Sequence, residues 1–533
     1  MVVTMWLVLG GLVVVMLANS VAHRSGLPAS VLLVAAGIAY GYLPGPNLEL
    51  DPEVVLDLVI PPLLYAAALQ ASLTALRRSA RAVVGLSVGL VLVTALAVGF
   101  GLSAAVAAVP LSVGIAIGAA VSPPDPVAAL SIGRRAGLPP RLINLVEGEG
   151  LLNDATALTI LQVAVAAAVG GTFSLGSAVG EFVVMAFGGI AVGLLLAVVV
   201  ARVRESVTDV MIDNAISLGT PFAAYLLAEE VHVSGVLAVV VAGLWLGHRN
   251  PRLQSSQARL QTRAVWRLVE FLLEGYVFVL IGQQLPAVVR GLRAYETGDV
   301  VTAAVVTVGT VLVVRPLWLL LAAHLPARMH ARLGGDPDEG PALSGREVVA
   351  LSWAGTRGVI TLAAAFSLPT DLPARDLLLF CAYLVVLVTL VGQGLTFAFL
   401  LRRLRLGGAQ VGQAILRNQA RAAALDAALV RLQELQDEDP TYREVVEPLR
   451  LAAKVRRLRY ADRVALLSAS EEDVLPVDDR YLRAVHVRRE MITAEREELL
   501  NWRDHGLLPD ADLRVLEREL DHQESVLPVP PRR

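Results

Sequence analysis

Asp154 stands in the middle of an apolar stretch, residues 141–169, that is long enough to cross a membrane as a helix. A charged side chain at the centre of such a helix costs about 2.5–3.5 kcal/mol on insertion scales, so it is by default a candidate functional group. Glu149 and Asn153 share one helix face, whereas Asp154 is rotated by about 100° from Asn153. One acid can therefore face a cavity while the other is paired within the bundle; an acid held neutral in a polar helix contact is the alternative.

A second acid, Asp125, lies within a cluster of prolines in the apolar segment 111–132. Proline removes a backbone donor and clashes with the preceding turn, so this segment is predicted to unwind at mid-depth. Unwound backbone in a bilayer is tolerated only where it is buried in protein or lines a water-filled cavity, and an acid placed there indicates a cation site. A kinked helix end with a solvated aspartate is the simpler alternative. The predicted break consists of Ser122, Pro123, Pro124, Asp125 and Pro126.

An arginine, Arg357, lies between Gly355 and Gly358 in another apolar segment. A guanidinium cannot be neutralised by losing its proton, so at this depth it requires an acidic partner. Glu149 or Glu147 is the predicted partner. Snorkelling of the side chain to the membrane surface is the alternative, but the flanking glycines favour a second broken helix.

The composition places these charges in a polytopic membrane protein. The chain is 55% hydrophobic and 17% charged, with a mean hydropathy of +0.63, against about 45–50% apolar and about 25% charged residues in soluble domains. The single cysteine, Cys381, excludes a disulfide framework and a cysteine metal site. No HExxH motif or phosphate-binding P-loop is present. The net charge of −3 says little about partners, and no nucleic-acid partner is expected. No cofactor is expected.

Windows of about 20 apolar residues, the length that crosses a bilayer, predict about thirteen transmembrane helices. Two of them, 209–228 and 265–289, also carry charges. The predicted breaks fall in the fifth and the twelfth helix, which run in opposite directions. Two six-helix repeats in inverted topology, joined by the seventh helix, would bring both breaks to the midplane, as in secondary transporters. The predicted helices are 5–22, 29–43, 54–71, 82–108, 111–132, 141–169, 178–201, 209–228, 233–247, 265–289, 299–325, 347–369 and 376–401.

The arginines between these segments predict the orientation, because cytoplasmic loops retain Lys and Arg. Loops on one side carry Arg24; Arg77, Arg78 and Arg81; Arg134, Arg135 and Arg141; Arg202 and Arg204; Arg249, Arg252, Arg259 and Arg263; Arg328, Arg332 and Arg346; and Arg402, Arg403 and Arg405. Loops on the other side carry only Arg290, Arg293 and Arg375. The N-terminus is therefore predicted outside and the C-terminus in the cytoplasm, which requires an odd number of helices.

The two ends of the chain carry separate predictions. The first apolar segment lacks the positive charge that normally precedes a signal peptide, so we expect an uncleaved first helix. Residues 1–405 are predicted to form the membrane domain, and 406–533 a helical cytoplasmic domain with leucine and alanine at helical spacing in 413–436 and 480–524. Ordinary helix packing explains those stripes; a regulatory or dimer-stabilising role is the alternative.

Three ordered motifs resemble the monovalent cation:proton antiporter-1 family, the sodium/proton exchangers. They are the run Ser122-Pro-Pro-Asp125-Pro-Val-Ala, the run Glu149-Gly-Leu-Leu-Asn153-Asp154 and the run Trp353-Ala-Gly-Thr-Arg357-Gly358. The resemblance covers about residues 5–401. It implies an all-α antiporter of Na⁺, with K⁺ and Li⁺ as further candidates, against H⁺ in a bacterial plasma membrane, acting as a homodimer in sodium transport and pH homeostasis. Transported ions and membrane lipid are then its partners.

The resemblance also implies roles for individual residues. Asp154 would bind the cation and the proton in alternation, Asp125 and Asn153 would be further cation-binding residues of the same site, and Glu149 would pair with Arg357 to hold the core together. An asparagine before Asp154 is the pattern of electroneutral members of the family. The chain departs from the family pattern at Pro124, where a threonine is frequent, at Gly150, where some members have a serine, and at Ala66, where many have an acid.

The predicted mechanism is competition at one carboxylate. Burial disfavours the charged form of an acid, so Asp154 would release its proton only when a cation replaces it. Exchange of one cation for one proton by alternating access follows, with no ATP. A cation channel, a membrane-embedded aspartic enzyme using Asp125 and Asp154, and a sensor that has lost transport are the competing interpretations.

Overall fold

The computed structural model describes residues 2–25, 27–43, 55–78, 80–136, 138–170, 175–324, 343–404, 406, 409–468, 479–505, 507–525 and 527. Within these ranges every regular element is helical and none is a strand. The chain divides into two compact units, Met1–Gly407 and Gly408–Arg533.

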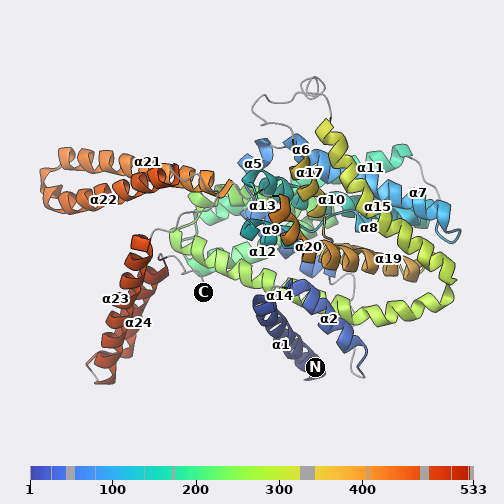
Figure 1. Ribbon diagram of the computed structural model, residues 1–533, viewed down its shortest axis with the longest axis horizontal. Helices are drawn as coiled ribbons and strands as arrows, with labels where there is room; N and C mark the ends of the chain where they lie inside the picture. The colour runs from blue at the N-terminus through green and yellow to red at the C-terminus, as the bar shows by residue number, and fades with distance from the viewer. Residues whose placement is uncertain are drawn as a thin grey trace. The chain divides into compact units, whose positions relative to one another are not determined.

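The first unit contains helical segments at the positions of the thirteen predicted helices (Figure 1). The elements of the first half are α1 (Val2–Ser25), α2 (Ala29–Gly41), η1 (Val55–Val59), α4 (Ile60–Gln70), α5 (Leu73–Arg78), α6 (Ala80–Val84), η2 (Gly85–Leu90), α7 (Val91–Ala105), α8 (Leu111–Val121), α9 (Pro126–Ala136) and α10 (Pro140–Gly170). Those of the second half are α11 (Leu175–Glu205), α12 (Val210–Glu230), α13 (Gly235–Leu253), α14 (Ser256–Gly291), η3 (Leu292–Ala294), α15 (Thr297–His324), α17 (Gly345–Trp353), α18 (Val359–Phe366), α19 (Arg375–Leu387), η4 (Val388–Gln393) and α20 (Gly394–Leu404).

Length and hydropathy agree with a polytopic membrane protein. Six of the described helical stretches are long and apolar enough to cross a bilayer, and further apolar helices are shorter. The six are Ala80–Ala105, Pro140–Gly170, Val179–Glu205, Val210–Glu230, Thr297–Ala322 and Arg375–Leu404. The shorter ones include Leu111–Val121, which ends where the chain unwinds. The all-α membrane fold predicted from the sequence is therefore confirmed.

Both predicted helix breaks are present. The fifth predicted helix is divided into α8 and α9, with Ser122–Asp125 outside both, and the twelfth is divided into α17 and α18 by 354–358. Pro126 is the first residue of α9, where its missing N–H is not needed by the helix. Asp125 directly precedes it, at the position where short polar side chains are favoured. The proline cluster thus ends one helix and starts the next.

Small residues let the helices around the breaks approach closely. A Cβ at Gly37 of α2 would overlap the Val279 carbonyl of α14, and a Cβ at Gly282 of α14 would overlap the Val34 carbonyl of α2. The Ala95 carbonyl of α7 would be overlapped in the same way by a Cβ at Gly118 of α8. Such backbone contacts are the usual basis of helix packing in lipid, where no hydrophobic force holds helices together.

The second unit consists of two helical hairpins. Helices α21 (Ala409–Glu438) and α22 (Arg443–Ser468) lie side by side, and so do α23 (Asp479–Asp504) and α24 (Asp510–Ser525) (Figure 1). The stripes in 413–436 and 480–524 correspond to α21, α23 and α24, whereas α22 was not foreseen as a separate helix. Cytoplasmic placement and a regulatory role for this unit stay predictions.

Candidate functional site

The two broken helices cross and hydrogen-bond to each other at their breaks. The Asp125 backbone N–H donates to the Thr356 carbonyl at 2.6 Å, and the Thr356 hydroxyl donates to the Asp125 carbonyl at 3.0 Å. These bonds satisfy backbone groups that the unwound segments would otherwise leave unpaired in a membrane. The two unwound segments are therefore joined to each other by hydrogen bonds.

Gly358 packs directly against the Asp125 side chain. A Cβ added there would overlap Oδ2 of Asp125. Its backbone is extended, at φ −132°, so the requirement for glycine is one of space and not of backbone conformation. The second break thus leaves room for the Asp125 carboxylate only because residue 358 has no side chain.

We expect Gly358→Ala to reduce cation-driven proton exchange severely, because the new methyl group must displace the Asp125 carboxylate. Overpacking of this kind costs typically about 1–3 kcal/mol in folded proteins. Gly309→Ala is the matched control, since a Cβ at Gly309 meets no atom within 4 Å. Exchange rates of the two variants in vesicles, normalised to protein amount, are the measurement; equal rates would contradict the steric role of Gly358.

Asp154 is buried on α10, with 5% of its surface exposed. Its backbone N–H donates to the Asn153 side-chain oxygen at 2.7 Å. Within the described chain, no hydrogen bond or ion pair holds its carboxylate. Because a buried carboxylate without a partner is costly, the group is suited to bind a proton or a cation.

A cavity of about 390 Å³ reaches this carboxylate. Asp125, Asp154, Glu270 and Glu274 are among the residues that line it, and no lysine, arginine or histidine is among those lining residues. The lining also includes Gly358 of the second break and Leu27, which is 40% exposed. Among the described residues that line the cavity, the charged side chains are thus all acidic.

Asn153 is placed differently from its predicted role as a cation ligand. Its side-chain NH₂ donates to the Pro124 carbonyl at 2.9 Å, and its side-chain oxygen accepts from the Asp154 N–H. The residue is fully buried and is not among those that line the cavity. In this structure Asn153 therefore ties α10 to the first break and positions Asp154 without facing the cavity.

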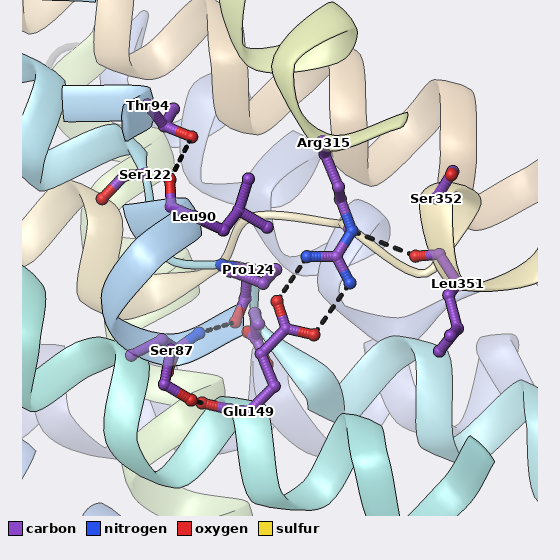
Figure 2. A network of polar contacts seen from close by, with 12 residues as sticks. Ser87, Leu90, Thr94, Ser122, Pro124, Glu149, Arg315, Leu351 and Ser352 are labelled. Carbon is purple, nitrogen blue, oxygen red and sulfur yellow. Dashed lines mark hydrogen bonds and ion pairs between the residues drawn. The ribbon is translucent and has the colours of Figure 1, made fainter. Parts of the chain in front are cut away.

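The predicted ion pair between Glu149 and Arg357 is wrong. Glu149 pairs with Arg315 of α15, whose Nη1 and Nη2 donate to the two carboxylate oxygens, the second at 2.9 Å (Figure 2). The Arg315 Nε donates to the Leu351 carbonyl of α17 at 3.0 Å. Both side chains are almost fully buried. This bidentate pair joins α10, α15 and the first half of the second broken helix.

Arg357 instead binds the carbonyl end of the first broken helix. Its Nε donates to the Val121 carbonyl and its Nη2 to the Ser122 carbonyl, each at 3.2 Å, and its Nη1 donates to the Gly355 carbonyl. A cation is favoured where a helix leaves its last carbonyls unpaired, because those carbonyls carry partial negative charge. The break itself thus supplies the partner that Arg357 needs.

Glu147, the other predicted partner of Arg357, forms an ion pair with Arg134, which is largely exposed. The sequence analysis does not identify Arg315, although its position carries the same signal as that of Arg357. It is a charged residue inside the predicted helix 299–325, followed directly by Pro316, and a guanidinium at that depth needs an acid.

The three departures from the family pattern have different surroundings. A side chain at Gly150 would overlap the ring of Pro126, so the proline fills the space that a serine would need. The Pro124 carbonyl accepts the hydrogen bond from Asn153. Ala66 is fully buried and is not among the residues that line the cavity, whereas its neighbour Ala67 is.

Known proteins share both the sequence pattern and the fold. Residues 11–403 match the family described as sodium/hydrogen exchanger, transmembrane. An uncharacterized Na(+)/H(+) exchanger of Mycobacterium tuberculosis is 32% identical over 545 residues, covering 98% of this chain and 97% of its own. A sodium, potassium, lithium and rubidium/H(+) antiporter of Bacillus subtilis is 29% identical over 516 residues, covering 93% of this chain and 74% of its own.

A solved structure shows the same fold. The sodium proton antiporter of Methanocaldococcus jannaschii at pH 8 superimposes with a TM-score of 0.61 at 21% identity, covering 76% of this chain and 99% of that protein. The match over residues 11–403 spans most of the first unit, including both breaks and Asp154. The chain belongs to the sodium/hydrogen exchanger family.

Proposed function

We propose that this protein exchanges a monovalent cation for a proton across the bacterial plasma membrane, and that both ions compete for the Asp154 carboxylate. The observation that carries this proposal is the buried carboxylate without a partner in the described chain, at a cavity whose described charged lining residues are all acidic. Asp125, at the crossing of the two breaks, lines the same cavity and supports the site.

Competition follows from the cost of burying charge. A carboxylate without a protein partner is stable at this depth only when a proton or a cation neutralises it. Each loaded state is then neutral at Asp154, and release of one ion requires arrival of the other. Because Asn153 precedes Asp154 where electrogenic relatives have a second acid, one cation is exchanged for one proton and no net charge moves.

Na⁺ is the proposed substrate, with K⁺ and Li⁺ as further candidates. The Mycobacterium tuberculosis relative carries the name of a Na(+)/H(+) exchanger, and the Bacillus subtilis relative is named for sodium, potassium, lithium and rubidium. Carboxylate and carbonyl oxygens are ligands that suit hard cations of this kind. Exchange driven by ion gradients needs neither a cofactor nor an enzymatic step, and a homodimer acting in pH homeostasis belongs to the same proposal.

The arginine-rich loops indicate which side the cavity faces. Asn19 and Ala22 of α1, together with Leu27, lie at the cavity and flank Arg24, which is in a predicted cytoplasmic loop. On this predicted orientation we propose that the cavity opens to the cytoplasm and that the protein is in an inward-facing state. In the outward-facing state, α10 and the two broken helices would have moved against the remaining helices to expose Asp154 on the other side.

We expect vesicles that contain the protein to lose an imposed pH gradient when Na⁺ is added, and to do so at the same rate whether or not the membrane potential is clamped with valinomycin and K⁺. The reason is that a 1:1 exchange moves no net charge. The rate of pH-gradient loss measured with Na⁺, with Li⁺, and with K⁺ in vesicles without valinomycin gives the cation preference. Choline serves as the control cation. A rate that follows the membrane potential would overturn the electroneutral stoichiometry, and cation flux without proton flux would indicate a channel.

A further inference from the structure

Helix α14 brings two further acids to the cavity. Glu270 and Glu274 are four residues apart, so they lie on one face of the helix, and both line the cavity together with Asp125 and Asp154. No sequence motif marks either residue; the segment 265–289 is predicted only as a helix that carries charges. Both stand outside the three motifs of the family resemblance.

The two acids differ in how they are held. The Glu270 carboxylate accepts a hydrogen bond from the side-chain NH₂ of Gln70 on α4 at 3.2 Å. For Glu274, no hydrogen bond or ion pair joins its carboxylate to any other residue in the part of the chain that the structure describes. Glu274 is only partly accessible. It therefore shares with Asp154 the property of an acid in a membrane cavity without a protein partner.

Helix packing does not explain why an acid stands at position 274. A charged group at membrane depth is retained where it serves an ion or substrate pathway, because its burial would otherwise be a net cost. Because none of the described residues that line the cavity is basic, we take the charge that balances Glu274 to come from a proton or from a cation in the cavity.

Asp154 and Glu274 belong to different parts of the bundle. Helix α10 packs against α8, the first half of a broken helix, whereas α14 packs chiefly against α2. The backbones of α14 and α2 touch at Gly37 and Gly282, which fixes α14 to that neighbour. A movement of α10 with the broken helices would therefore separate Asp154 from Glu274.

We propose that Glu274 is a second cation-binding carboxylate, which captures the monovalent cation in the inward-facing cavity before and during its binding to Asp154. This proposal rests on the proposed exchange function and adds a ligand from outside the broken-helix core. Because the two acids face one cavity only in the inward-facing state, Glu274 raises the affinity for cations on the cytoplasmic side and not on the opposite side.

The test is the apparent KM for Na⁺ of Glu274→Gln, measured separately from each side of the membrane in everted and right-side-out vesicles. Glutamine keeps the shape of the side chain and removes its charge. We expect the cytoplasmic KM to rise by about tenfold, the external KM to stay unchanged, and the maximal rate to stay within about twofold of the wild type. Glu274→Asp, which restores the charge, should recover most of the cytoplasmic affinity.

Glu270→Gln is the matched control, because it removes the same charge one turn away on the same helix, where Gln70 already holds the carboxylate. Its cytoplasmic KM should rise less than that of Glu274→Gln. An unchanged cytoplasmic KM in Glu274→Gln, or an equal rise on both sides, would overturn the proposal. A fall in maximal rate with KM unchanged on both sides would also overturn it, because that result indicates a structural role.

Failure of this inference and failure of the proposed function give different results. If the wild-type protein shows no cation-driven proton movement, the exchange function is wrong. If the wild type exchanges and Asp154→Asn does not, but Glu274→Gln behaves as the wild type, only the role of Glu274 is wrong.

Discussion

Replacement of Arg315 by glutamine is expected to destabilise the membrane unit by about 3–5 kcal/mol, because it leaves the Glu149 carboxylate buried and unpaired. The substitution also removes the hydrogen bond from Nε to the Leu351 carbonyl at the end of α17. We expect a large fall in melting temperature in detergent and in the amount of folded protein. Exchange activity should fall in parallel, since the pair holds α10 beside the second break.

The double variant Glu149→Gln/Arg315→Gln shows how much of the lost stability comes from the unpaired Glu149 charge and how much from the lost side-chain contacts. With both charges removed, the cost of an unpaired buried charge disappears, and most of the lost stability should return. Arg267→Gln on α14 is a control for loss of an arginine, since Arg267 is exposed and its Nε bonds only to its own helix. The interpretation is contradicted if Arg315→Gln is as stable as Arg267→Gln.

Asp154→Asn is expected to reduce cation-driven proton exchange to the rate of vesicles without protein, with folding preserved. The amide has nearly the shape of the carboxylic acid, so the packing of α10 is kept, but it cannot give up a proton or neutralise a cation. Removal of a costly buried acid should leave the stability equal or slightly higher. The rate of collapse of a pH gradient in vesicles is the measurement.

Asp371→Asn is the control for this variant, because Asp371 is exposed and lies outside the cavity. It should exchange at the wild-type rate. Normal exchange by Asp154→Asn would instead require another acid of the cavity, Asp125 or Glu274, to be the site of competition.

The sequence was sufficient for features that depend on local chemistry. The proline cluster predicted the first break because proline acts on its own turn of the helix, and Gly355 and Gly358 favoured the second for a similar reason. The thirteen apolar segments followed from the fixed thickness of the bilayer. These predictions needed no knowledge of which helices touch.

Local chemistry did not predict which charged side chains pair with each other across helices. Arg357 was given an acidic partner because a buried guanidinium needs one, but carbonyls at the end of α8 meet that need. Arg315 carried the same signal and was overlooked, although it is the residue that pairs with Glu149. One sequence with two buried arginines and several acids allows more than one pairing, and only the packing of α15 against α17 selects among them.

The cavity was the least predictable feature. Asn153 was expected to bind the cation, but its side-chain NH₂ donates to the Pro124 carbonyl. That hydrogen bond depends on how α10 packs against the break. Glu270 and Glu274 were visible only as charges in a long helix. Their place on the cavity that Asp154 lines depends on how α14 packs against its neighbours, which local sequence does not show.

The most direct test of competition at Asp154 is proton release on cation binding. Purified protein in weakly buffered detergent solution is titrated with NaCl, with choline chloride as the ionic-strength control, and the change in pH is recorded. If Na⁺ and the proton share this carboxylate, the wild type releases protons saturably with Na⁺ and Asp154→Asn does not. Release of the same number of protons by Asp154→Asn would contradict the account.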